Sequence, residues 1–343
     1  MRKSVHQLIV AILIVVVPEM GLTGEMLFSG KTMGTTYRIK IVGDHLGDQE
    51  QWQALIDKRL DAVNQSMSTF IADSEIGRFN RFEKIDAPFS ISNGFLSVML
   101  AAKRIYQDTD GAWDGTVRPL VNLWGFGTGQ MTGRIPSDDD VKTILPATGF
   151  YLITISEKGF LMKKSSRVTL DLSSIAKGYG VDDIATALKQ NGCTRFLVEI
   201  GGEVYASGKK ENGDSWKVGI NTPRKDAPID QIYKVVELSD KALATSGDYR
   251  NFFENKGKTY SHVIDPRTGY PVKNGVVSVS ILSDTCMVAD GLATAVMVMG
   301  AEKGLDLVNR LENTESLIVV SRSKGSFENI YSKGFTNFEY GKH

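Results

Sequence analysis

The stretch Val288-Ala289-Asp290-Gly291-Leu292-Ala293-Thr294-Ala295 runs directly into Val296-Met297-Val298-Met299-Gly300. An apolar run of this length that ends at glycine predicts a buried helix with a glycine stop. Asp290 and Thr294 are four residues apart, so their side chains leave one face of that helix. A carboxylate in an apolar helix is costly unless something pairs with it. Two oxygen ligands one turn apart suit a hard cation such as Mg²⁺.

The alternative for this pair is purely structural. Near a helix N-terminus an aspartate is favoured by the helix dipole, and a threonine can hydrogen-bond back to the helix. Taken alone, the stretch favours this structural interpretation. The metal hypothesis therefore depends on what the rest of the chain supplies.

Bulk composition describes a globular protein. The chain has 343 residues, of which 42% are hydrophobic and 23% charged. This length can bury the core of one large domain or two ordinary ones. The formal net charge is zero and no long basic run occurs, so we expect no nucleic-acid partner.

The N-terminus reads as a targeting segment. Arg2 and Lys3 precede ten apolar residues at 8–17, too few to span a bilayer as a free-standing helix. This pattern predicts a secretory signal over residues 1–24 and a mature domain over 25–343. The expected location is the periplasm. An uncleaved anchor in the inner membrane stays open as the alternative, because the cleavage region is poor.

Strand and helix patterns are mixed without strict alternation, which favours an α+β fold. Helical spacing predicts helices at 51–67, 95–106 and 180–190. Strand patterns occur at 35–42, 153–155, 167–171, 196–200, 216–220, 233–238, 276–282 and 317–321. No internal repeat is present.

The segment Asp171-Leu172-Ser173-Ser174-Ile175-Ala176-Lys177-Gly178 leaves a strand and enters a helix. This pattern predicts Lys177 at the start of the helix. Free backbone N–H groups and the helix dipole favour an anion at that place, and the lysine can neutralise a phosphate bound there. The alternative is an ordinary capped turn with Asp171 or Ser173 near the N-cap. The glycine spacing of a Walker-type loop is missing.

Of the four histidines, only His262 lies in a dense polar segment, Tyr260-Ser261-His262-Val263-Ile264-Asp265-Pro266-Arg267-Thr268-Gly269. The residues from Asp265 onward predict a turn, which Asp265 and Arg267 could simply pin. One eligible histidine leaves no His-based zinc site. The two cysteines, Cys193 and Cys286, show no zinc spacing, and a disulfide or two buried thiols both stay open.

These motifs, together with Gly30-Lys31-Thr32-Met33-Gly34-Thr35-Thr36-Tyr37, resemble the ApbE family of FAD:protein FMN transferases, in the same order and from about residue 30 to 300. The resemblance implies mixed sheets with flanking helices, in two lobes around a central cleft for FAD and a metal ion. It implies a Mg²⁺ site formed by Asp290, Thr294 and Ser174, the last through its backbone carbonyl. The implied contacts to FAD are Met33, Phe70, Ala112, Trp113, Asp114, Asp171, Lys177 and Ile264. Gly201-Gly202-Glu203 also recurs in the family and is assigned to site architecture.

The implied reaction moves FMN from FAD to a threonine or serine hydroxyl of an acceptor protein and releases AMP. His262 is the candidate that takes the hydroxyl proton. Family analogy implies acceptors among the flavoprotein subunits of membrane respiratory complexes, such as the sodium-pumping NADH:quinone reductase. Many members are lipoproteins, but this chain has no cysteine after its apolar N-terminal run.

Phe70 departs from the family pattern, in which transferases usually carry tyrosine and some hydrolase-like members carry asparagine. Phenylalanine keeps the stacking face and loses the hydroxyl. A metal-dependent FAD pyrophosphatase that gives FMN and AMP is therefore the first alternative. A non-catalytic flavin-binding protein outside the cytoplasm is the second, and the presence of Asp290, Thr294 and His262 argues against it.

Overall fold

The computed structural model describes residues 24–43, 46–127, 135–210, 212–228, 231–248, 252–255, 257–322 and 325–341. The expected signal segment lies outside these residues except for its last position, Gly24. Among the helices that are described, none combines the length and apolar character needed to cross a membrane.

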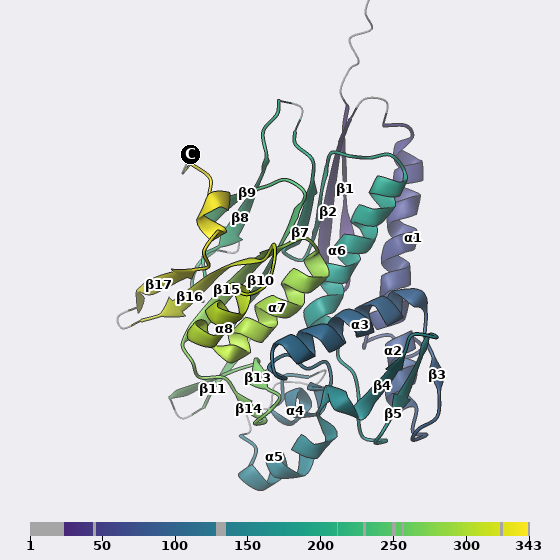
Figure 1. Cartoon of the computed structure of the whole chain (residues 1–343), viewed down its shortest axis with the longest axis vertical. Coiled ribbons are helices and arrows are strands. Elements are labelled where there is room, and N and C mark those ends of the chain that lie inside the picture. The colour runs from purple at the N-terminus through teal and green to yellow at the C-terminus, as the bar shows by residue number, and fades with distance from the viewer. Residues whose placement is uncertain are drawn as a thin grey trace, which may run out of the picture.

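An eight-stranded sheet forms the centre of the molecule, and every neighbouring pair of its strands is antiparallel (Figure 1). The strand order is β1-β2-β6-β7-β10-β15-β16-β17. The strands are β1 (Gly24–Thr32), β2 (Thr35–Gly43), β6 (Phe196–Ile200), β7 (Glu203–Ser207), β10 (Lys241–Gly247), β15 (Val276–Ser283), β16 (Glu315–Ser321) and β17 (Phe327–Tyr331).

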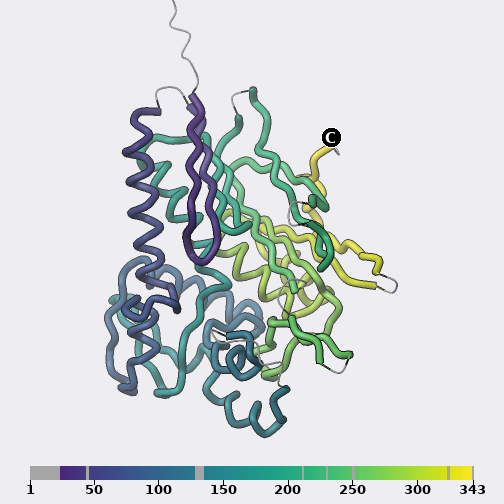
Figure 2. The backbone as a smooth tube through the Cα atoms, turned by 180° about the vertical axis from the view of Figure 1, so that it is seen from behind, coloured from purple at the N-terminus to yellow at the C-terminus, as the bar shows by residue number. Residues whose placement is uncertain are grey.

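The two faces of this sheet are covered differently. One face carries α1 (Gln49–Met67), α6 (Ser173–Gln190), α7 (Cys286–Met299) and α8 (Ala301–Val308). Figure 2 shows α1 beside the β1–β2 hairpin, where both close one end of the sheet. The other face is covered by the hairpin of β8 (Trp216–Asn221) and β9 (Ile232–Leu238) and by the short helix η4 (Phe335–Phe338).

A second region lies below the helical face in Figure 1. Its longest helix, α3 (Asn93–Asp108), packs its buried face against α7. Around it lie α2 (Glu75–Arg81), α4 (Arg118–Leu123), α5 (Asp138–Ile144), η1 (Leu145–Ala147) and η2 (Phe150–Leu152). Short strands complete the region: β3 (Phe89–Ser90), β4 (Ile153–Ser156), β5 (Phe160–Lys163), β11 (Phe252–Asn255), β12 (Lys258–Ser261), β13 (Ile264–Asp265) and β14 (Tyr270–Pro271).

The predicted α+β class is confirmed, but two predicted elements were wrong. The segment 167–171 is not a strand; the partner of β4 is β5 instead. The side-chain amide of Asn80 takes the place of a strand neighbour, since its Nδ2 donates to the Leu170 carbonyl at 2.8 Å and its Oδ1 accepts from the Leu170 N–H at 2.7 Å.

The other correction concerns α6, which begins at Ser173 rather than at residue 180. Gly178 and Gly180 suggested a late start because glycine weakens a helix. Here they permit close packing inside the helix: a Cβ on Gly178 would overlap the carbonyl of Cys286, and one on Gly180 would press on Met33 and Ile200. Lys177 therefore lies in the second turn, not at the helix start.

Candidate active site

A cavity of about 550 Å³ lies where the helices of the main sheet meet the second region. Its walls come from the loop after α1, from α4, α6, α7, β7 and β10, and from the histidine segment. Eight of the predicted catalytic, FAD-contacting and metal-binding residues line it: Phe70, Asp171, Ser174, Lys177, His262, Ile264, Asp290 and Thr294. Segments that are far apart in the chain thus meet in one place.

Asp290 occupies the contact between α6 and α7. It is only 3% exposed, yet it reaches the cavity. Its Oδ2 accepts the backbone N–H of Gly178 at 3.0 Å. In a regular helix that N–H bonds the carbonyl of Ser174, so the Asp290 carboxylate and the Ser174 carbonyl lie next to each other. One turn along α7, the hydroxyl of Thr294 lies 3.0 Å from that of Ser246 on β10.

Lys177 places a positive charge between two carboxylates. Its Nζ is 2.9 Å from Glu203 Oε1 and 3.7 Å from Asp290 Oδ1. Burial alone would lower the pKa of Lys177, but the charges of Asp290 and Glu203 outweigh it and hold the pKa above its ordinary value. The ammonium group therefore stays charged at neutral pH. Its place is set by these carboxylates rather than by a helix N-terminus.

Glu203 is the residue that sequence reasoning undervalued. It is 4% exposed and starts β7 directly after the Gly201-Gly202 turn. Burial raises the pKa of its carboxyl, against the lowering effect of Lys177. Within the described part of the chain, its Oε2 has no hydrogen-bond partner. The glycine pair at a strand end was the available signal, but the contact with Lys177 needs the folded sheet.

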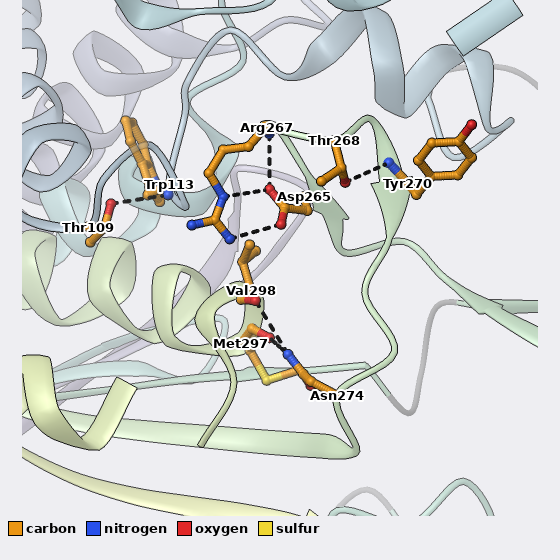
Figure 3. Close-up of polar contacts among 9 residues, drawn as sticks. All are labelled: Thr109, Trp113, Asp265, Arg267, Thr268, Tyr270, Asn274, Met297 and Val298. Carbon is orange, nitrogen blue, oxygen red and sulfur yellow. Dashed lines mark hydrogen bonds and ion pairs between the residues drawn. The ribbon is translucent and has the colours of Figure 1, made fainter. Parts of the chain in front are cut away.

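His262 lines the cavity between the second region and the sheet, with its ring 6.3 Å from that of Phe126. The turn that follows is held by Asp265 and Arg267, as the structural alternative predicted. The N–H and Nε of Arg267 each donate to Asp265 Oδ1 at 2.9 Å, and Nη2 donates to Oδ2 at 2.8 Å (Figure 3). Asp265 and Arg267 thus hold the segment that carries His262.

The remaining predicted FAD contacts lie outside the walls of this cavity. Met33 sits in the turn between β1 and β2 and packs against Gly180. Ala112 and Trp113 are buried, and the indole Nε1 of Trp113 donates to Ser174 Oγ at 3.0 Å, so this ring positions the start of α6. Figure 3 shows the backbone N–H of Trp113 donating to the hydroxyl of Thr109, at 3.2 Å.

Asp114 lines a separate cavity of about 490 Å³ beside Arg267. Its carboxylate accepts the N–H groups of Thr116 at 2.7 Å and Phe150 at 3.0 Å. Burial raises the pKa of this carboxyl above its ordinary value. These bonds make Asp114 a support for the surrounding loops.

The donor set at Asp290 suits a hard cation. It combines one carboxylate, the Thr294 hydroxyl and the Ser174 carbonyl, and Mg²⁺ takes few protein oxygens because it keeps waters and substrate oxygens. Across the described ranges, no group of three or more His, Cys, Asp or Glu side chains could hold a metal ion. Cys193 and Cys286 are both buried free thiols.

Comparison with known proteins identifies the family of this chain. The ApbE family model matches residues 33–318. The FAD:protein FMN transferase of Vibrio cholerae serotype O1 is 42% identical over 315 residues, which cover 92% of each chain. That of Haemophilus influenzae is 38% identical over 318 residues, 91% of each chain.

Solved structures give the same result. The flavin transferase ApbE from Vibrio cholerae superposes with a TM-score of 0.83 at 40% identity, covering 92% of this chain and 99% of that one. The apo form of the Pseudomonas stutzeri flavinyl transferase ApbE gives a TM-score of 0.81 at 36% identity, covering 92% and 97%. The sequence match and the fold together establish that this chain belongs to the ApbE family.

Proposed function

We propose that this protein transfers FMN from FAD to a threonine or serine hydroxyl of an acceptor protein and releases AMP. One observation carries the proposal: three separate motifs bring Lys177, His262, Asp290 and Thr294 into one cavity. Relatives with 42% and 38% identity are FAD:protein FMN transferases, which supports the same reaction here.

The cavity is suited to a pyrophosphate. Phosphoryl transfer needs alignment and charge neutralisation more than covalent help from the protein. The Lys177 ammonium is held at the cavity wall by Glu203 and is available to the phosphates of FAD. Asp290, Thr294 and the Ser174 carbonyl would hold Mg²⁺, which when bound supplies Lewis acidity at phosphate oxygens.

The transfer needs no reactant besides FAD and the acceptor hydroxyl. The acceptor hydroxyl oxygen forms a bond to the FMN-side phosphorus, and the bond from that phosphorus to the bridging oxygen breaks. AMP leaves with the bridging oxygen. His262 is the group on the cavity wall that takes the hydroxyl proton. Phe70, at the rim, offers a ring that covers the flavin and limits attack by water.

The acceptor and the location are further parts of the proposal. A secretory pattern over residues 1–24 supports export to the periplasm, with an inner-membrane anchor if the segment is kept. An exported flavin transferase would act on acceptors that face this side of the membrane. Flavoprotein subunits of respiratory complexes with a threonine-containing motif, such as the sodium-pumping NADH:quinone reductase, are the acceptors we propose.

The metal assignment is tested at Asp290. We expect Asp290→Ala to abolish FMN transfer and Mg²⁺ dependence, because the only charged ligand of the site is lost. Asp306→Ala, which removes an exposed carboxylate from the neighbouring helix α8, should leave both unchanged. The measurements are acceptor flavinylation at varied Mg²⁺ and calorimetric titration of Mn²⁺. Full activity of Asp290→Ala in metal-free buffer would contradict the assignment.

A further inference from the structure

The first turn of α7 is held by a side chain from another helix. The residue at its N-cap position, Thr285, makes no side-chain cap hydrogen bond. Instead, Asp182 of α6 accepts the N–H of Cys286 at 2.8 Å through Oδ1 and the N–H of Met287 at 2.9 Å through Oδ2. A carboxylate at this end satisfies free N–H groups and complements the helix dipole. One residue therefore docks the start of α7 onto α6.

The same face of α6 carries the other contacts between the two helices. Ser174, Gly178 and Asp182 follow one another at intervals of four, so they share a face. Asp182 meets Cys286, and Gly178 meets Asp290, so the two helices run antiparallel. One further turn places Ser174 level with Thr294, and both line the cavity.

This arrangement has little freedom to slide. A Cβ on Gly178 would overlap the backbone of Cys286 and Met287, so the helix backbones are in direct contact there. If α7 shifted along α6, Asp290 and Thr294 would leave the level of the Ser174 carbonyl. The double hydrogen bond to Asp182 holds the N-terminal turn of α7 against α6.

We propose that Asp182 is a positioning residue for the metal site: by holding the N-terminus of α7, it sets the register in which Asp290 and Thr294 face Ser174. This inference rests on the proposed metal site and assigns Asp182 no contact with metal or substrate. Outer contacts that orient ligands in this way typically change metal affinity by about 10–100-fold when removed.

The neighbouring residue provides a matched control. Asp183 lies on the same helix, is buried, and pairs through both carboxylate oxygens with Arg59 of α1. Asp183→Ala removes an acidic side chain and a helix–helix contact from α6 without touching α7. A role in stability alone would make Asp182→Ala and Asp183→Ala behave alike.

The experiment compares wild type, Asp182→Ala, Asp182→Asn, Asp183→Ala and Asp290→Ala in the full chain. It measures Mn²⁺ affinity by calorimetry, thermal unfolding, and amide exchange in the first turn of α7. We expect Asp182→Ala to weaken Mn²⁺ binding by about 10–100-fold and to speed exchange in that turn. Asp182→Asn, which keeps one acceptor oxygen, should fall between it and the wild type. Asp183→Ala should lower the unfolding temperature while keeping near-normal Mn²⁺ affinity.

Two results would overturn the inference. Equal Mn²⁺ affinity in Asp182→Ala and Asp183→Ala would show that Asp182 only stabilises the fold, and Asp182→Asn gives the same comparison if the alanine variant does not fold. Wild-type Mn²⁺ binding by Asp290→Ala would refute the metal site itself, and the inference with it. The Asp290→Ala sample thus separates the two failures.

Discussion

His262 is the residue whose role is most directly testable by kinetics. We expect His262→Ala to slow FMN transfer by roughly 10²–10⁴-fold, the usual effect of a lost general base, while FAD affinity stays close to that of the wild type. Single-turnover flavinylation and FAD titration measure the two quantities separately. A parallel loss of FAD affinity would make His262 a binding residue, and an unchanged rate would assign the proton to another group.

Phe70 decides how well the flavin is shielded. Phe70 is 83% exposed at the cavity rim, so its ring is free to stack on a bound cofactor. We expect Phe70→Tyr to be nearly neutral, because the stacking surface is kept. Phe70→Asn should increase the share of FAD that is hydrolysed to FMN and AMP, because water gains access to the phosphorus. Chromatography of products with and without acceptor measures this share, and an unchanged share in Phe70→Asn would refute the shielding role.

Single residues were predictable where the chemistry is local. The spacing of Asp290 and Thr294 predicted a shared helix face, and both do line the cavity. The sequence could not predict that Glu203 pairs with Lys177, because β7 and α6 are brought together only by the folded sheet. Asp182 was missed for the same reason: its partners are backbone N–H groups more than a hundred residues away.

At the level of elements, the contact of α6 with α7 predicts a strong effect at Gly178. We expect Gly178→Ala to lower the free energy of unfolding by about 1–3 kcal/mol, the usual cost of overpacking, and to weaken metal binding. Gly291→Ala is the control: its added Cβ would overlap the terminal Cδ1 of Ile105 at 2.6 Å, a side-chain end that can move aside, and would meet Ile175 at an ordinary contact distance of 3.6 Å. Urea unfolding and Mn²⁺ titration of both variants test this, and equal effects would contradict the account.

Regular elements followed from their patterns, and irregular ones did not. The apolar run before Gly300 correctly predicted the end of α7. The helix stops there because Gly300 has a φ of 83°, a conformation that favours glycine. The segment 167–171 has a strand-like composition, but its Leu170 pairs with the side chain of Asn80. The start of α6 was misplaced because glycines that permit helix contact look the same in sequence as glycines that end a helix.

At the scale of the whole molecule, a buried lysine makes stability depend on pH. Lys163 is fully buried, and its Nζ donates to the Asn80 carbonyl at 3.2 Å and lies 4.8 Å from the Phe79 ring centre. Burial lowers its pKa from 10.5 to about 8. The folded state holds this proton less tightly than the unfolded state. The charged, buried lysine therefore lowers the free energy of unfolding by its full amount below pH 8. This destabilisation fades as the pH rises toward 10.5.

We therefore expect Lys163→Met to gain stability relative to the wild type at pH 7, by about 1–3 kcal/mol. This advantage should shrink between pH 8 and pH 10.5. The exposed neighbour Lys164, changed to Met, should show no such trend. The measurement is denaturant unfolding across this pH range. If the difference in free energy of unfolding between Lys163→Met and the wild type did not vary with pH, the charge on buried Lys163 would not be what destabilises the fold.

We infer that this protein transfers FMN to a protein hydroxyl rather than to water. The most direct measurement is the intact mass of a threonine-motif acceptor domain after incubation with the protein, FAD and Mg²⁺. Samples without Mg²⁺ and with Asp290→Ala serve as controls. We expect an acceptor heavier by one FMN moiety, with AMP released in equal amount and little free FMN. Rapid release of FMN and AMP with an acceptor of unchanged mass would contradict this inference and establish the pyrophosphatase alternative.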